Sequence, residues 1–160
     1  MTANDLLGLI LVDSQRIATA VSTGAQWEIW MQVELALLFR DVGFEVAREV
    51  PYPPPVDSLR LDLLVQDPGS SSRCAIEMKV ESATNSGVRI IADLETDLVK
   101  IGRYNVEGLA EKWVVGVAYS AVAKEKFQNH ALQYPAMIIV GESDGVGAIV
   151  ISATPLLAQF

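Results

Sequence analysis

The chain has 160 residues, of which 51% are hydrophobic and 20% are charged, and its formal net charge is −8. This length and apolar content favour one folded domain and argue against a disordered chain. The negative charge argues against a broad basic surface that grips nucleic acid, but a local basic patch remains open.

One cysteine, Cys74, and one histidine, His130, limit the chemistry open to the chain. A single cysteine forms no intramolecular disulfide, which suits a reducing compartment. Zinc sites made of histidine and cysteine are not expected, and no G-x-S-x-G nucleophile elbow occurs. The apolar run over residues 6–12 follows no basic residue and is too short to span a bilayer. We therefore expect a cytoplasmic protein that does not enter a membrane.

The first half of the sequence predicts two helices and then three strands. The helices cover residues 2–22, capped by Asn4 or Asp5, and residues 22–43, ended by Gly43. A strand over 44–52 stops at a run of prolines. Strands over 59–67 and 73–82 flank a short glycine- and serine-rich loop, which predicts an antiparallel hairpin.

The second half alternates helices and strands. Helices are expected over 86–105 and 121–133, and strands over 112–120, 136–143 and 146–152. This order predicts an α/β fold in which helices flank a central mixed β-sheet. We expect residues 1–160 to form a single domain, because no linker or internal repeat divides them.

Three charged residues interrupt the apolar strands of the hairpin. Asp62 lies in the first strand, and Glu77 and Lys79 lie in the second. Because side chains alternate along a strand, Glu77 and Lys79 share one face about 7 Å apart. Pairing of the two polar faces brings Asp62 to them. A hairpin with one solvated face produces the same pattern, so an ordinary wet face is the alternative.

These residue types suit metal-assisted hydrolysis of a phosphodiester. Two neighbouring carboxylates repel each other unless a cation joins them. Mg²⁺ favours carboxylate oxygens and keeps several waters, one of which it can orient and acidify. A nearby lysine can position that water and stabilise the oxyanion that forms.

The pattern Asp62…Glu77-Met78-Lys79 resembles the split motif of the PD-(D/E)xK nuclease superfamily, which has the restriction-endonuclease-like fold. Leu61 stands where the motif has its nominal proline. The predicted elements from residue 25 to about 140 resemble the α-β-β-β-α-β core of that family, with the first helix and the last strands as additions. The resemblance implies a Mg²⁺-dependent endonuclease, with Mn²⁺ as a substitute, whose substrate is DNA. Asp62, Glu77 and Lys79 would be catalytic, and the two acids would hold the metal.

The resemblance also points to the neighbouring helices. Family members often carry an acidic residue on the helix before the sheet, and Glu34 is the first choice for this catalytic, metal-binding role, with Glu28 second. Glu34 falls in an apolar stripe, where a carboxylate needs a partner, so a structural arginine is the alternative. On the helix after the motif, Lys100 is the candidate phosphate contact. Apart from the resemblance, a basic concentration in the C-terminal half makes Arg103 a second candidate nucleic-acid contact, with scattered surface charge as the alternative; its other members are Lys112, Lys124 and Lys126. A solvated helix face is the alternative for Lys100.

Three functions remain open from the sequence. The first is the nuclease, which would need a homodimer or two events to cut both strands. The second is a catalytically idle protein of the same fold that acts as a binding, immunity or regulatory partner, and its acidic charge would suit a basic protein. The third is an unrelated α/β domain whose charged residues form a wet face.

Overall fold

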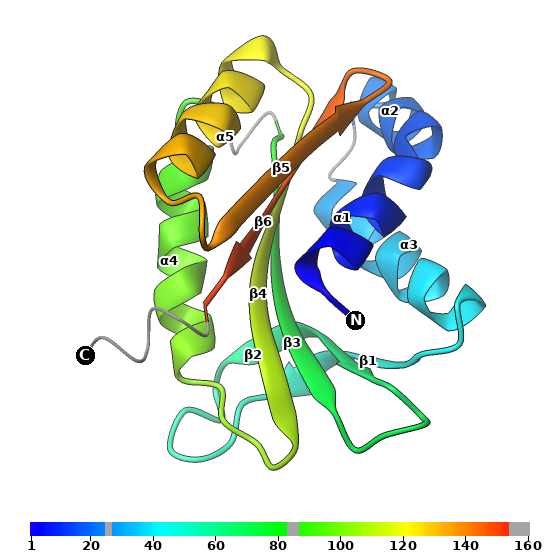
Figure 1. The fold of residues 1–160 in the computed structure, drawn as a ribbon, viewed down its shortest axis with the longest axis vertical. Coiled ribbons are helices and arrows are strands. Elements are labelled where there is room, and N and C mark those ends of the chain that lie inside the picture. The colour runs from blue at the N-terminus through cyan, green and yellow to red at the C-terminus, as the bar shows by residue number, and fades with distance from the viewer. Residues whose placement is uncertain (25–26, 83–86, 154–160) are drawn as a thin grey trace.

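The computed structural model describes residues 1–24, 27–82 and 87–153. Within these residues, five helices flank one six-stranded mixed sheet, which confirms the expected α/β class (Figure 1). The helices are α1 (Ala3–Val12), α2 (Ser14–Ser22), α3 (Trp27–Asp41), α4 (Ile90–Gly102) and α5 (Ala121–Gln133). The strands are β1 (Glu45–Pro51), β2 (Arg60–Gln66), β3 (Arg73–Val80), β4 (Leu109–Ala118), β5 (Ile138–Ser143) and β6 (Val146–Ser152).

The N-terminal region forms two helices where the sequence pattern predicted one. The capping residue of α1 is Thr2, because its side chain accepts from the Asp5 N–H while the Asp5 carboxylate accepts from the Thr2 N–H. The prediction that Asn4 or Asp5 caps this helix was therefore wrong. The break falls at Asp13, and α2 begins at Ser14. The Ser14 hydroxyl donates to the Asp144 carboxylate at 2.6 Å, so the start of α2 is tied to the β5–β6 turn.

The strand order across the sheet is β1-β2-β3-β4-β6-β5. The predicted hairpin is confirmed, because β2 and β3 pair antiparallel. β3 and β4 pair parallel, and α4 makes the crossover that parallel neighbours require. β6 lies between β4 and β5 and is antiparallel to both, so the last two strands extend the same sheet.

Helices cover both faces of the sheet. In Figure 1, α1, α2 and α3 lie on one side and α4 and α5 on the other. Side chains of β3 alternate between the two cores: Ile76 and Met78 pack under α1 and α3, and Ala75 packs under α4 and α5. Every residue of β4 from Lys112 to Ala118 is buried, as expected for a central strand.

Glu81, directly after β3, joins the ends of three elements. Its Oε2 accepts from the backbone N–H groups of Tyr119 (2.9 Å) and Ser120 (2.8 Å), at the start of α5. Its backbone carbonyl accepts from the indole N–H of Trp27, the first residue of α3, at 2.8 Å. The end of β3 is therefore fixed against the beginnings of two helices, one on each face of the sheet.

Candidate active site

The hairpin opens at the position of the three predicted charges. Ladder pairing between β2 and β3 ends at Leu63 and Ile76. Beyond that pair, Asp62 Oδ2 accepts a hydrogen bond from the backbone N–H of Met78 at 2.7 Å. A buried N–H needs an acceptor, and here a side-chain carboxylate supplies it in place of a strand carbonyl. Asp62 therefore bridges the gap and lies beside the Glu77–Lys79 segment.

Glu77 is deeply buried, with 1% of its surface exposed. The Tyr52 hydroxyl donates to its Oε1 at 2.6 Å, and the Lys100 ammonium donates to its Oε2 at 2.7 Å. Burial, followed by the nearby charge of Asp62, raises the pKa of Glu77 to about 8, while the bonds from Lys100 and Tyr52 act in the opposite direction. A wet sheet face, the alternative interpretation, is therefore wrong for this residue.

Lys79 is placed between carboxylates from two helices. Its Nζ lies 3.7 Å from Glu28 Oε1 on α3 and 3.7 Å from Asp97 Oδ2 on α4. Burial by itself lowers the pKa of Lys79, but Asp97, Glu28 and Asp62 outweigh it and raise the value. The ammonium is thus held charged between these two carboxylates, and Asp62 lies near enough to contribute to the same effect.

Asp97 is the carboxylate that the sequence did not assign to the site. It is 8% exposed, and among the described residues its Oδ2 has no hydrogen-bond partner. Burial raises the pKa of Asp97 to about 6, although Lys79 and Lys100 lower it. Asp97 and Lys100 are three positions apart on α4, a spacing that puts both on one face of a helix and could have signalled their joint role.

The side of α4 that carries Asp97 and Lys100 faces the sheet, so the alternative of a solvated helix face is wrong for these two residues. Two acid–base pairs connect the elements: Glu77 with Lys100, and Lys79 with Asp97. One turn after Lys100, Tyr104 is buried and makes an edge contact with Tyr52, with ring centroids 5.0 Å apart. Tyr52 was also missed, because nothing in the sequence separates it from the other aromatic residues of the core.

Glu34 does not join the cluster. It is buried, and its Oε2 pairs with Arg16 of α2 at 2.9 Å, so the alternative of a structural arginine describes it. Glu28, the second choice, is the acid of α3 that reaches Lys79. The two acids are six positions apart, which places their side chains about 120° apart around the helix, so they face different surroundings.

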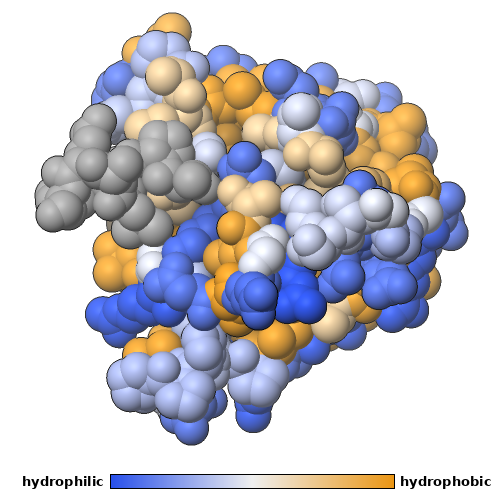
Figure 2. Space-filling model, turned by 60° about the horizontal axis from the view of Figure 1, so that its bottom comes forward, coloured by the Kyte–Doolittle hydropathy of each residue, from blue (hydrophilic) through white to orange (hydrophobic). Residues whose placement is uncertain are grey.

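Of the predicted basic residues, one contacts the site and the others lie elsewhere. Lys100 faces Glu77, whereas Arg103 is exposed just after α4. Lys112, from the same basic concentration of the sequence, is buried and donates to Asn105 Oδ1 at 2.9 Å. Lys124 pairs with Glu142 at 2.6 Å. Figure 2 shows hydrophilic and apolar residues interspersed over the face that it presents.

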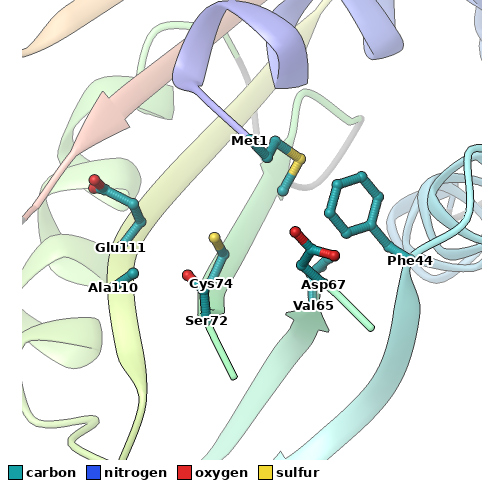
Figure 3. A pocket seen from close by; sticks show the side chains of 8 residues that line it. All are labelled: Met1, Phe44, Val65, Asp67, Ser72, Cys74, Ala110 and Glu111. Atoms are coloured by element: carbon teal, nitrogen blue, oxygen red, sulfur yellow. The ribbon is translucent and has the colours of Figure 1, made fainter. Parts of the chain in front are cut away.

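A separate pocket of about 150 Å³ lies on the opposite face of β3 (Figure 3). Cys74 opens onto it, and strand alternation turns Cys74 away from the side that carries Glu77. Burial raises the pKa of this thiol to about 11, so it stays protonated and is a poor nucleophile. The pocket is lined by Met1, Phe44, Val65, Asp67, Ser72, Cys74, Ala110 and Glu111.

The donor set beside Lys79 fits a divalent cation held through few protein ligands. Among the described residues, no three histidine, cysteine or acidic side chains form a ready-made metal cage. Mg²⁺ commonly takes one or two carboxylates and fills its remaining positions with water, and Asp62 and Glu77 could supply those two. Four acids, Asp62, Glu77, Asp97 and Glu28, lie around the two ammonium groups, and within the described ranges Asp97 Oδ2 accepts no hydrogen bond, so this cluster offers oxygen acceptors to a cation.

Comparisons of the chain with protein-family models, with curated proteins and with solved structures found no match. In the three stretches that the structure describes, no helix is long and apolar enough to cross a membrane. What the chain does must therefore be inferred from the chemistry of the site.

Proposed function

We propose that the chain is a Mg²⁺-dependent nuclease of the PD-(D/E)xK type, which hydrolyses phosphodiester bonds in DNA. One observation carries the proposal: Asp62, Glu77 and Lys79 lie together where β2 and β3 separate, and the buried Glu77 has a pKa raised to about 8. Strongly shifted groups that share an opening with a specific charge partner are typical of catalytic sites.

Each residue has a defined task. Asp62 and Glu77 would hold the cation, which supplies an acidified water and neutralises charge on the phosphate. Lys79, fixed between Asp97 and Glu28, orients the attacking water and stabilises the developing oxyanion. Tyr52 holds Glu77 through its hydroxyl, so that carboxyl is oriented before a cation arrives.

We expect few contacts with the substrate, and those contacts would come from basic residues near Glu77. Lys100 and Arg103 lie at the end of α4, where they can meet phosphates of a bound strand. With a net charge of −8 and only two candidate phosphate contacts, the chain should bind DNA weakly and with a shallow salt dependence. Mn²⁺ should replace Mg²⁺, because both accept oxygen ligands.

A specific observation also favours the second candidate, an idle protein of the same fold that binds a basic partner. Both oxygens of Glu77 and one oxygen of Asp62 already accept hydrogen bonds within the protein. Such a self-satisfied network can serve stability alone. An acidic surface would then select a basic protein.

Cleavage of plasmid, single-stranded DNA and RNA with Mg²⁺ or Mn²⁺ separates the two candidates. We expect cleavage of DNA by the wild-type chain and its loss in Lys79→Met. Lys126→Met on α5 removes the same charge away from the site and is the matched control. Cleavage that survives Lys79→Met would point to a contaminant. Absence of cleavage on every substrate, together with tight binding of a basic protein, would establish the idle candidate instead.

A further inference from the structure

We infer that Lys100 is an internal cation that occupies the Glu77 carboxyl in the resting protein, and that a binding divalent metal displaces its ammonium toward a substrate phosphate. The inference depends on the proposed role of Glu77 as a metal ligand. It adds a competition between a side chain of the protein and the metal for one carboxyl group.

The two donors on Glu77 differ in charge. Tyr52 donates a neutral hydroxyl to Oε1 at 2.6 Å, whereas Lys100 donates a charged ammonium to Oε2 at 2.7 Å. A carboxylate has spare lone pairs, so a neutral donor can stay when a metal binds. An ammonium and a divalent cation bound to the same carboxyl group repel each other strongly. Glu77 is so buried that little water can screen the charge of the ammonium from that of the metal. Metal binding to Glu77 therefore requires Lys100 to leave.

The two donors also differ in freedom. Tyr52 is 1% exposed and packs against the buried Tyr104, so it cannot move away without disturbing the core. The Lys100 side chain is 27% exposed and sits on a flexible four-carbon stem in the last turn of α4. Its ammonium also lies 6.0 Å from the centroid of the Tyr52 ring, too far for a strong contact. Lys100 is thus the donor that can swing out.

Lys79 differs from Lys100 in this respect. It is held by carboxylates from both sides, Glu28 and Asp97, so it keeps partners whether or not Glu77 binds a metal. The two lysines therefore have separate tasks. Lys79 stays beside the reacting atoms, and Lys100 moves between Glu77 and a phosphate.

Competition for one site is reciprocal, so removing the charge of Lys100 should tighten metal binding. The same change should weaken DNA binding, because a bound phosphate would lose its contact with the Lys100 ammonium. A lysine that only stabilised the fold would not change these two affinities in opposite directions. The pair of measurements thus separates displacement from a merely structural role.

The test measures Mn²⁺ binding to the whole chain by electron paramagnetic resonance. We expect Lys100→Met to lower the Mn²⁺ dissociation constant at least about fivefold, the lower range for coupled sites. Lys100→Arg keeps the charge and should leave the dissociation constant within about twofold of wild type. Arg103→Met removes a charge from the same end of α4, where no bond to Glu77 is lost, and should behave like Lys100→Arg. Equal or weaker Mn²⁺ binding by Lys100→Met, or none in either protein, overturns the inference.

Lys100→Gln guards against misfolding, because its amide can still donate to Glu77 without a charge. Should Lys100→Met fail to fold, the same tightening is expected of Lys100→Gln, and its absence contradicts the displacement. Failure of the proposed function looks different. Tighter Mn²⁺ binding without DNA cleavage by any variant would support displacement and reject the nuclease. Cleavage by wild type with unchanged Mn²⁺ affinity in Lys100→Met would support the nuclease and reject displacement.

Discussion

Asp62 Oδ2 accepts the backbone N–H of Met78, a residue with no exposed surface, at 2.7 Å. This bond gives Asp62 a structural task in addition to its proposed catalytic one. It supplies an acceptor for a backbone N–H of β3 at the point where ladder pairing with β2 has ended. The bond uses one of the two carboxylate oxygens of Asp62, so the same side chain could both shape the site and hold a cation through its other oxygen.

Two substitutions of Asp62 should separate these tasks. Asp62→Asn keeps an oxygen acceptor for Met78, whereas Asp62→Ala leaves a buried N–H without one. We expect Asp62→Ala to lower the free energy of unfolding by about 1–3 kcal/mol, and Asp62→Asn to lower it clearly less. Both should abolish metal-dependent cleavage. Urea unfolding measures the difference, and equal stability of the two variants would contradict the role of the Met78 bond.

The metal-free protein should lose stability as the pH rises through the titration of Glu77. Its pKa is raised from 4.5 to about 8, so between these values the folded chain keeps a proton that the unfolded chain has released. The free energy of unfolding should therefore fall with rising pH in this window, by at most about 1.4 kcal/mol per pH unit from this group. Glu77→Gln should remove that slope. Urea titrations at several pH values test it, and an unchanged slope above pH 6 would show that another group is responsible.

Asp97 should affect stability at lower pH than Glu77 does, and it should affect catalysis through its contact with Lys79. Its pKa is raised from 3.8 to about 6, so stability should also fall with rising pH between these values, and Asp97→Asn should remove this part. The same variant deprives Lys79 of one of its two carboxylate partners. We expect kcat to drop on the order of tenfold to a hundredfold, as for a misplaced catalytic group. Full activity in Asp97→Asn would mean that Glu28 alone positions Lys79.

The two acids of α3 should give opposite results. Glu34→Gln should leave cleavage near the wild-type rate, because Glu34 pairs with Arg16 on another side of the helix. A double-mutant cycle with Arg16→Met should yield a coupling of about 0.2–1 kcal/mol in stability, since the Arg16 side chain is 65% exposed. Glu28→Gln should reduce kcat instead, because it removes a carboxylate 3.7 Å from Lys79. Cleavage assays and urea unfolding of the wild type, the three single variants and the double variant decide between these roles.

Much of the fold follows from local patterns in the sequence. The alternation of residues 59–67 and 73–82 predicts the hairpin, and the apolar run of β4 predicts a strand buried on both faces. The break at Asp13 was not predictable from periodicity, because the apolar residues on each side keep helical spacing. A distant contact accompanies it, the bond from Ser14 to the β5–β6 turn, and periodicity carries no information about such a contact.

The site was predictable only in part, for a related reason. Alternation shows that Glu77 and Lys79 share a face, but it does not show what covers that face. The cover is α4, and its placement follows from the parallel crossover between β3 and β4. For Glu34, the apolar stripe correctly indicated burial and the need for a partner. The partner proved to be Arg16, which lies outside the helix that was considered.

The two ion pairs between β3 and α4 have a consequence for how the chain finds its register. Along β3 the acid precedes the base, and along α4 the acid also precedes the base, so the pairs Glu77–Lys100 and Lys79–Asp97 can form together only when the elements run in opposite directions. Sliding α4 by one turn would bring Asp97 toward Glu77 and place two acidic side chains together, without a basic partner, in a buried setting. The residues proposed for catalysis thus also exclude neighbouring misalignments of the helix, in the way that buried polar residues can specify one packing among several.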